Sequence, residues 1–265
     1  MAESTWSLPF LSHSPPSSSS SATETTSPTP SQPHALIILN QPFSLPLLHL
    51  VWRACTWHCC ADGGANRLHD VLKCTPAGVD ERSLLLPDLI KGDLDSLRGD
   101  VTEYYASQGV PIVHDPDQYS TDLMKCIHIL SDKEKTEGIT YDIIILGGLS
   151  GRLDQTVHTL SLLHKLRKSR KHIYAISDDN LAWVLDKGEH HIRINHELLG
   201  PTCGLLPVGI DSTSITTRGL RWNLTDCISS FDGMVSTSNH LLPGEDVWIK
   251  TTKPIWWTVE LRTLR

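Results

Sequence analysis

The sequence lacks the features that mark membrane, nucleic-acid-binding and metalloprotease chains. No apolar run approaches the length of about 20 residues that a helix needs to span a bilayer, so no membrane role is expected. The formal net charge is −7, whereas binding nucleic-acid phosphates requires a basic surface, so no nucleic-acid partner is expected. The fourteen histidines form no HExxH or similar array, and we interpret them as surface or packing residues.

The seven cysteines form no CxxC pair, and their odd number does not suggest a disulfide framework. Cys55, Cys59 and Cys60 lie close to His58, so a zinc site is one interpretation of this segment. The interpretation that we favour is a reduced, partly buried strand in a protein of the cytosol.

Basic residues are missing from the first part of the chain, where the first lysine or arginine is Arg53. Residues 1–33 are rich in serine, threonine and proline, a composition that cannot bury enough apolar surface to offset the entropy lost on ordering. A plastid transit peptide is also serine-rich, but organelle signals usually carry basic residues. We therefore predict a disordered cytosolic tail over residues 1–33.

From residue 34 onward, short apolar runs alternate with segments of helical periodicity. Strands are expected at residues 35–39, 56–61, 84–90, 110–113, 141–146 and 173–176. Helices are expected at residues 62–73 and 100–108, after Ser120 or Thr121, and from Leu153. This alternation predicts an α/β domain over residues 34–177, in which helices cover both faces of a parallel sheet.

Helical periodicity disappears after residue 177. Short strands between turn residues are expected at 181–185, 190–194, 204–207, 215–217, 234–236 and 256–261. They predict a small antiparallel β-sandwich domain over residues 178–265. Ligands of parallel sheets bind at the carboxyl ends of the strands, so the chemistry is expected in the first domain.

Four aspartates stand where predicted strands end or a helix begins: Asp62, Asp93, Asp95 and Asp122. Any one of them could be a cap or a turn residue, but four in one sheet indicate a functional site. Magnesium typically takes one or two carboxylates and completes its octahedron with water and substrate phosphates, which suits Asp93 and Asp95. The pattern favours a magnesium-dependent enzyme that transfers a phosphate-type group from a nucleotide.

The segment Gly147-Gly-Leu-Ser-Gly-Arg-Leu-Asp154 runs from a predicted strand into a helix. Its backbone amides, the helix N-terminus and Arg152 together could bind an anion, although such loops also occur as plain α/β packing. The chain has no Walker A sequence and no protein-kinase catalytic loop, which excludes those two families.

A series of segments, in order along the chain, resembles the thiamine pyrophosphokinase family in its plant-like form. In the first domain the segments are residues 61–67 (ADGGANR), 91–96 (KGDLDS), Gln118 with 120–125 (STDLMK), 147–154 (GGLSGRLD) and 177–180 (SDDN). In the second domain they are residues 203–209 (CGLLPVG), 217–224 (TRGLRWNL) and 235–239 (VSTSN). The resemblance covers residues 34–262, and together these motifs are specific.

The resemblance implies a homodimer whose active sites lie at the subunit interface. It implies that pyrophosphate passes from Mg²⁺-bound ATP to the hydroxyl of thiamine, which yields AMP and thiamine diphosphate. By this analogy the catalytic residues are Asp62, Asp93, Asp95 and Asp122, and the metal ligands are Asp93, Asp95 and Asp122. The nucleotide would be bound by Gly147, Gly148, Gly151, Arg152, Asp154 and Lys125. Thiamine would be bound by Gln118 and by the partner's Trp222, the partner's Ser238 and the partner's Asn239.

One position departs from the family pattern. Tyr119 stands where the family carries an acidic residue, and the preceding acids Asp115 and Asp117 could compensate. Two other functions stay open: a metal-dependent phosphohydrolase, since acid clusters at strand ends also serve hydrolysis, and a non-catalytic thiamine- or nucleotide-binding protein.

Overall fold

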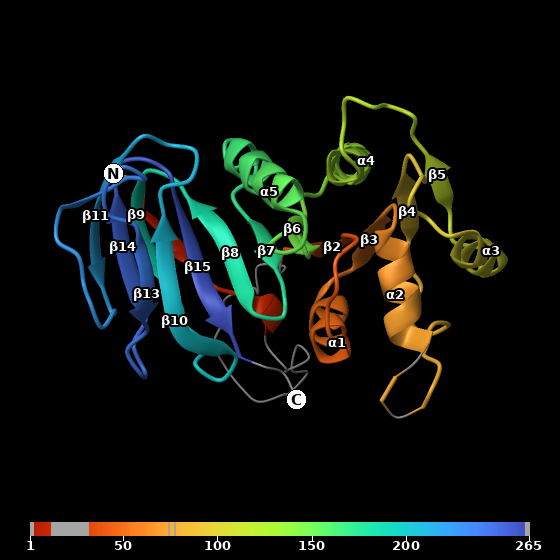
Figure 1. Cartoon of the computed structure of the whole chain (residues 1–265), viewed down its shortest axis with the longest axis horizontal. Coiled ribbons are helices and arrows are strands. Elements are labelled where there is room, and N and C mark those ends of the chain that lie inside the picture. Colours follow the sequence, from red (N-terminus) through yellow and green to blue (C-terminus); the bar gives the residue numbers. More distant parts are fainter. Residues whose placement is uncertain (1–2, 12–31, 74, 77, 263–265) are drawn as a thin grey trace, which may run out of the picture.

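A computed structural model describes residues 3–11, 32–73, 75–76 and 78–262 (Figure 1). The first part contains β1 (Glu3–Trp6), η1 (Pro9–Leu11), β2 (His34–Ile38), α1 (Leu45–Ala54), β3 (Trp57–Ala61), α2 (Gly64–Lys73), β4 (Leu89–Gly92), α3 (Gly99–Ser107), β5 (Ile112–His114), α4 (Asp122–Glu137), β6 (Asp142–Leu146), α5 (Leu153–Leu166) and β7 (Ile173–Ile176). The second part contains β8 (Asn180–Leu185), β9 (Gly188–Ile192), β10 (Leu199–Leu206), β11 (Thr213–Arg218), β12 (Cys227–Ser229), β13 (Ser236–His240), β14 (Val247–Thr251) and β15 (Ile255–Leu261).

The strands β7-β6-β2-β3-β4-β5 form a parallel sheet in that order. Both faces of the sheet are covered, since α1, α2 and α3 pack into one hydrophobic cluster while α4 and α5 pack into the other. Every residue of β2 is buried, as expected for a strand covered on both sides. The predicted helix-flanked sheet is therefore confirmed.

Helix α1 is one element that the sequence pattern did not predict. Ser44 caps it by accepting the N–H of Leu47 at 3.4 Å, and Pro46 lies in its first turn. Proline breaks helices in their interior but is tolerated in the first turn, where no intrahelical N–H bond is lost.

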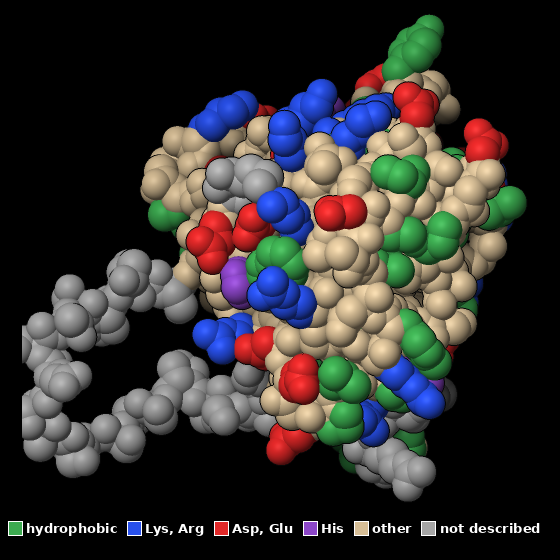
Figure 2. Space-filling view, turned by 90° about the vertical axis from the view of Figure 1, so that its left-hand side faces the viewer, with side chains coloured by type: hydrophobic (Ala, Val, Ile, Leu, Met, Phe, Trp, Pro, Cys, Tyr) green, Lys and Arg blue, Asp and Glu red, His purple; other side chains and the backbone are tan. Residues whose placement is uncertain are grey.

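The second part of the chain is a β-rich domain, as predicted. Its strands β8, β15, β10 and β13 extend the parallel sheet, because β8 pairs antiparallel with β7. A second sheet, in the order β1-β9-β14-β11-β12, shares buried residues with this extension, among them Trp257 of β15 and Ile249 of β14. Figure 2 views the molecule from this end and shows acidic and basic side chains interspersed. None of the described helices is both long and apolar enough to cross a membrane.

The N-terminal residues correct a prediction. Glu3–Trp6 forms β1, which pairs parallel with β9 at the edge of the second sheet, and Phe10 and Leu11 are buried. A disordered tail is therefore wrong for residues 3–11, while residues 12–31 lie outside the described residues. The serine-rich composition of residues 12–31 dominated the average and concealed the apolar residues Trp6, Leu8, Phe10 and Leu11.

This N-terminal segment connects the two domains. The indole Nε1–H of Trp6 donates to His190 Nδ1 at 3.0 Å, and His190 Nε2 lies 2.7 Å from the carbonyl oxygen of Asp186. A carbonyl can only accept, so His190 carries its proton on Nε2 and receives the indole hydrogen at Nδ1. Phe10 reaches the other domain, where its ring centroid lies 5.1 Å from that of Tyr174 in β7.

Candidate active site

Three carboxylates meet at the carboxyl ends of neighbouring strands. Asp62 follows β3, Asp93 follows β4 and Asp122 opens α4, and ligand oxygens of the three all lie within 4.8 Å of one another. Strands β3 and β4 are adjacent and parallel, so the residues that follow them reach the same edge of the sheet. Gly92 permits this approach, because a Cβ atom there would lie 2.7 Å from Asp62 Cβ and 3.0 Å from Asp122 Oδ1.

Asp62 is the most buried of the three acids. Its Oδ2 accepts the N–H of Ser96 at 3.1 Å, but its Oδ1 is buried and has no hydrogen-bond partner among the described residues. Burial, and then the negative charge of Asp122, raise the pKa of Asp62 above its ordinary value. A buried carboxylate oxygen without a partner is costly, and a cation bound among the three acids would offset that cost.

Lys125 provides only part of the needed positive charge. Its buried Nζ lies 3.3 Å from Asp122 Oδ1 and 4.0 Å from Asp93 Oδ2. One lysine beside three carboxylates leaves the cluster negative. The carboxylate oxygens of Asp62, Asp93 and Asp122 are ligands that Mg²⁺ prefers, so the residues of the cluster fit this metal. Lys125 contacts these acids and does not line the cavity that opens beside them, and its predicted role in binding the nucleotide stays a prediction.

Asp95 lies outside this group. It is exposed, its N–H donates to Asp93 Oδ1 at 3.2 Å, and its Oδ1 accepts the hydroxyl of Ser96 at 2.8 Å. The structure thus replaces Asp95 by Asp62 among the carboxylates that could share one ion. Asp62 joins the group because β3 pairs with β4, and the role of Asp95 as a metal ligand stays a prediction.

A cavity of about 500 Å³ opens beside the cluster. Among the predicted residues, its walls include Asp62, Asp93, Asp122, Gln118, Gly151 and Arg152. The lining residues without a predicted role include Asn40, Gln41, Arg67, Ser96, Gln155 and His158. Asp154, Gly147 and Gly148 do not line it, although they belong to the same loop. The cavity therefore joins an acidic cluster to the arginines that an anion would need.

The conformation of the glycine loop, residues 147–151, depends on its glycines and on a hydrogen bond to Gln41. Gly147, Gly148 and Gly151 have φ angles of 104°, 84° and 80°, a region that favours glycine. Gln41 Oε1 accepts the N–H of Gly148 at 2.8 Å, so this amide is already engaged and does not face a ligand. Asp154 holds the exposed guanidinium of Arg152, with Oδ2 at 2.6 Å from its nearest nitrogen. Asp154 is thus placed to orient Arg152.

Gln118 and its neighbours form the rim of the cavity. The side chain of Tyr119 is 98% exposed, and its N–H donates to Asp117 Oδ1 at 2.9 Å. Asp115 pairs with Lys91 at 2.8 Å. Neither Asp115 nor Asp117 belongs to the three-carboxylate group, so compensation by these two acids is not seen in the described residues.

The predicted thiamine-binding residues of the second domain lie together, but none of them lines the acidic cavity. Trp222 is 52% exposed, so it is not a core residue of the sandwich. Asn239 is buried, where its Oδ1 accepts the N–H of Trp222 at 3.2 Å and its Nδ2 donates to the Trp222 carbonyl at 2.8 Å. Ser238 has a φ of 55°. Asn239 therefore positions the Trp222 loop, and its side-chain groups are engaged there.

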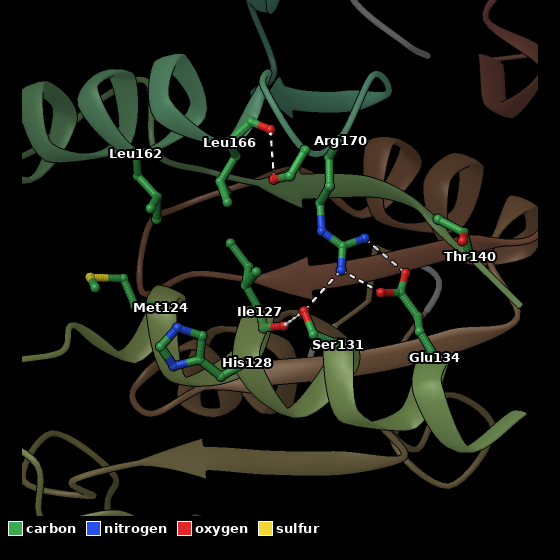
Figure 3. A pocket seen from close by; sticks show the side chains of 10 residues that line it. Met124, Ile127, His128, Ser131, Glu134, Thr140, Leu162, Leu166 and Arg170 are labelled. Carbon is green, nitrogen blue, oxygen red and sulfur yellow. Dashed lines mark hydrogen bonds and ion pairs between the residues drawn. The ribbon is translucent and has the colours of Figure 1, made fainter. Parts of the chain in front are cut away.

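A second cavity, of about 330 Å³, lies between α4 and α5 and contains none of the predicted residues (Figure 3). Arg170 points across it to Glu134, with NH1 2.8 Å from Oε1, and NH2 donates to Ser131 Oγ at 2.9 Å. Both charged side chains are about nine-tenths buried. This ion pair ties α4 to the segment after α5, and we interpret it as structural.

Comparisons with known proteins agree with the geometry. Residues 48–175 match the model of the thiamin pyrophosphokinase catalytic domain, and residues 189–256 match that of the vitamin B1 binding domain. The chain belongs to the thiamine pyrophosphokinase family. A thiamine pyrophosphokinase of Oryza sativa subsp. japonica is 38% identical over 96% of this chain and 99% of its own. The family resemblance found in the sequence is therefore confirmed.

Solved structures of thiamine pyrophosphokinases have the same fold. A yeast thiamin pyrophosphokinase superposes with a TM-score of 0.78 at 29% identity, over 89% of this chain and 88% of its own. The Candida albicans protein superposes with a TM-score of 0.76 at 26% identity, over 87% of this chain and 89% of its own.

Proposed function

We propose that this chain transfers pyrophosphate from Mg²⁺-bound ATP to the hydroxyl of thiamine, which gives thiamine diphosphate and AMP. The observation that carries the proposal is the three-carboxylate cavity, built on the carboxyl ends of the sheet in a chain that matches both domains of the family. Transfers of this kind depend on positioning and charge neutralisation much more than on covalent catalysis.

Asp62, Asp93 and Asp122 would hold the magnesium ion, which supplies neutralising charge for the transferred phosphates. Lys125 holds Asp93 and Asp122 in position from the buried side. Arg152, oriented by Asp154, and Gly151 would contact the nucleotide phosphates, and Gln118 at the rim would contact the aminopyrimidine of thiamine. Asp95, whose backbone N–H donates to Asp93 Oδ1, would orient that ligand.

We also propose that the site is completed in a homodimer by the partner's Trp222. Within one chain Trp222 does not line the acidic cavity, and half of its side chain is exposed. Exposed apolar side chains are also found near the cavity, at Tyr119, Leu153 and Val157, where a partner could cover them. The indole would stack on the thiamine cation, an interaction worth about 0.5–2 kcal/mol.

An assay that identifies both products tests the reaction. With ATP, magnesium and thiamine, we expect AMP and thiamine diphosphate to form together. Phosphate released from ATP without thiamine would indicate a phosphohydrolase, and binding without turnover would indicate a non-catalytic binding protein.

Mixing two defective chains tests the shared site. An Asp62→Asn chain and a Trp222→Ala chain are each expected to be impaired at low thiamine concentration. A mixed dimer would contain one site with both defects and one with neither, so activity should reappear when subunits exchange. No recovery despite proven exchange would mean that Trp222 and Asp62 of one and the same chain share a site, or that Trp222 belongs to no site.

The cytosolic location stays a proposal. It is supported by six free cysteines among the described residues, five of them buried, a pattern typical of reducing compartments. A fusion of residues 1–33 to a reporter that accumulated in an organelle would contradict it.

A further inference from the structure

We propose that His158 is a nucleotide-binding residue of this site, whose imidazole is held by Thr121 and donates a hydrogen bond to a phosphate oxygen of the nucleotide. The inference rests on the proposed function, because it assigns a role in the same cavity. His158 belongs to none of the segments that resemble the family, and the sequence alone predicts a packing or surface histidine at this position.

The position of His158 sets it apart from the other histidines. It lies in the second turn of α5, is partly buried, and is the one histidine of the described residues that lines the acidic cavity. Its Nε2 lies 3.0 Å from Thr121 Oγ1, while Nδ1 has no hydrogen-bond partner among the described residues. Thr121 directly precedes Asp122, so His158 connects the helix of the glycine loop to the helix of the acids.

The hydrogen bonds of Thr121 favour one tautomer of His158. Thr121 is the N-cap of α4, and its Oγ1 accepts the N–H of Met124 at 3.4 Å. The hydroxyl hydrogen then remains available to be donated to His158 Nε2. An imidazole that accepts at Nε2 carries its proton on Nδ1, which makes Nδ1 a donor for an anion. Burial and then the charge of Lys165 lower the pKa of His158, which agrees with a neutral ring.

The surroundings favour a polyphosphate as the partner of this donor. Arg152 is the N-cap of α5 and lies on the same side of this helix as Gln155 and Thr159. All three line the cavity together with Arg67. The N-terminal end of a helix carries partial positive charge, which attracts phosphate. A cationic thiamine ring would gain nothing from these donors. The wall made by α5 therefore fits a nucleoside di- or triphosphate, whereas the acids fit its metal.

Direct binding of ADP in the presence of Mg²⁺ tests the assignment without requiring turnover. His158→Ala should weaken ADP binding about tenfold, or about 1.4 kcal/mol, measured by calorimetry on the full chain. His158→Asn, whose amide N–H can occupy the place of Nδ1–H, should recover most of that affinity. His128→Ala is the matched control, because His128 is an exposed histidine of α4 outside this cavity, and it should bind ADP as the unmodified chain does.

The kinetic constants provide the second readout. In His158→Ala, the KM for ATP should rise by about the same factor of ten, whereas the KM for thiamine should stay within about twofold. ADP affinity unchanged in His158→Ala would overturn the proposal, as would equal losses for ATP and thiamine, which would make His158 only a support for α4. If His158→Ala fails to fold, the variants His158→Asn and His158→Leu are compared instead. The proposal then requires His158→Asn to bind ADP more tightly than His158→Leu does. Failure of the proposed reaction would show in the products of the unmodified chain, independently of these binding data.

Discussion

The acidic cavity and the N-terminal junction both gather buried polar side chains, but they satisfy them differently. At the junction, the Trp6 indole donates to His190 and the other nitrogen of His190 meets the Asp186 carbonyl, so every ring nitrogen has a partner. In the cavity, Asp62 Oδ1 is buried without a hydrogen-bond partner in the described part of the chain, and two further carboxylates lie nearby.

This difference separates groups that stabilise the fold from groups that await a ligand. Buried polar atoms are nearly always paired in folded proteins, so an unpaired one calls for an explanation. Like charges held together cost stability, and proteins retain them where function requires it. The comparison predicts that substitutions in the cavity lower activity but not stability, and that substitutions at the junction do the reverse.

The largest effect is expected at the acids. Asp93→Asn should lower turnover at least about a thousandfold, or roughly 4 kcal/mol of barrier, because it removes a carboxylate from the metal cluster. Without magnesium its melting temperature should equal or exceed that of the unmodified chain, since one like charge is removed. Turnover and thermal melts with and without magnesium check both parts. Near-normal activity at limiting magnesium would remove Asp93 from the metal site.

The next effect is expected at the junction. Trp6→Ala should destabilise the fold by about 3 kcal/mol, because it empties the space of a buried indole. Denaturant titration measures the loss, and kcat below the melting temperature should stay nearly unchanged. Trp6→Phe is the control, since it keeps an aromatic ring and should lose less. Equal stability of Trp6→Ala and the unmodified chain would mean that residues 3–11 do not dock in solution.

A pH dependence distinguishes the junction further. Burial, as the largest cause, lowers the pKa of His190 below its ordinary value; Asp186 opposes this, and Lys171 and His191 reinforce it. Because the unfolded chain takes up the proton first, the stability from a neutral His190 is complete above about pH 6.5 and declines below it.

The slope attributable to one such group is at most about 1.4 kcal/mol per pH unit. His190→Gln can keep both hydrogen bonds without titrating, so its stability should fall less between pH 6.5 and 5. His128 is an exposed residue of α4, so the stability of His128→Gln should depend on pH as that of the unmodified chain does. Identical pH profiles of stability for His190→Gln and the unmodified chain would show that His190 does not contribute to the pH dependence of folding.

The sequence predicted what depends on local pattern. Apolar runs identified the strands of the parallel sheet, and three of the four predicted acids form the carboxylate group. It missed what depends on pairing between distant segments: the place of Asp62 among the carboxylates that could share a metal ion, the hydrogen bond from Gly148 to Gln41, and the pairing of β1 with β9. The composition of the N-terminal segment cannot reveal that Trp6 forms a hydrogen bond with His190, 184 positions away.

The smallest effect is expected at Tyr119, which lies at the rim of the cavity and tests how far the acidic cluster extends. Its side chain is 98% exposed, and the loop is held through its backbone by Asp117. In Tyr119→Asp the new carboxylate would therefore stay in solvent, and exposed substitutions usually change free energies by no more than about 0.5 kcal/mol. The magnesium concentration for half-maximal activity should then shift by about twofold or less, with Tyr119→Asn as the uncharged control. A tenfold gain in magnesium affinity specific to Tyr119→Asp would show that the loop folds inward when metal binds, and that the cluster of three acids is completed by a fourth.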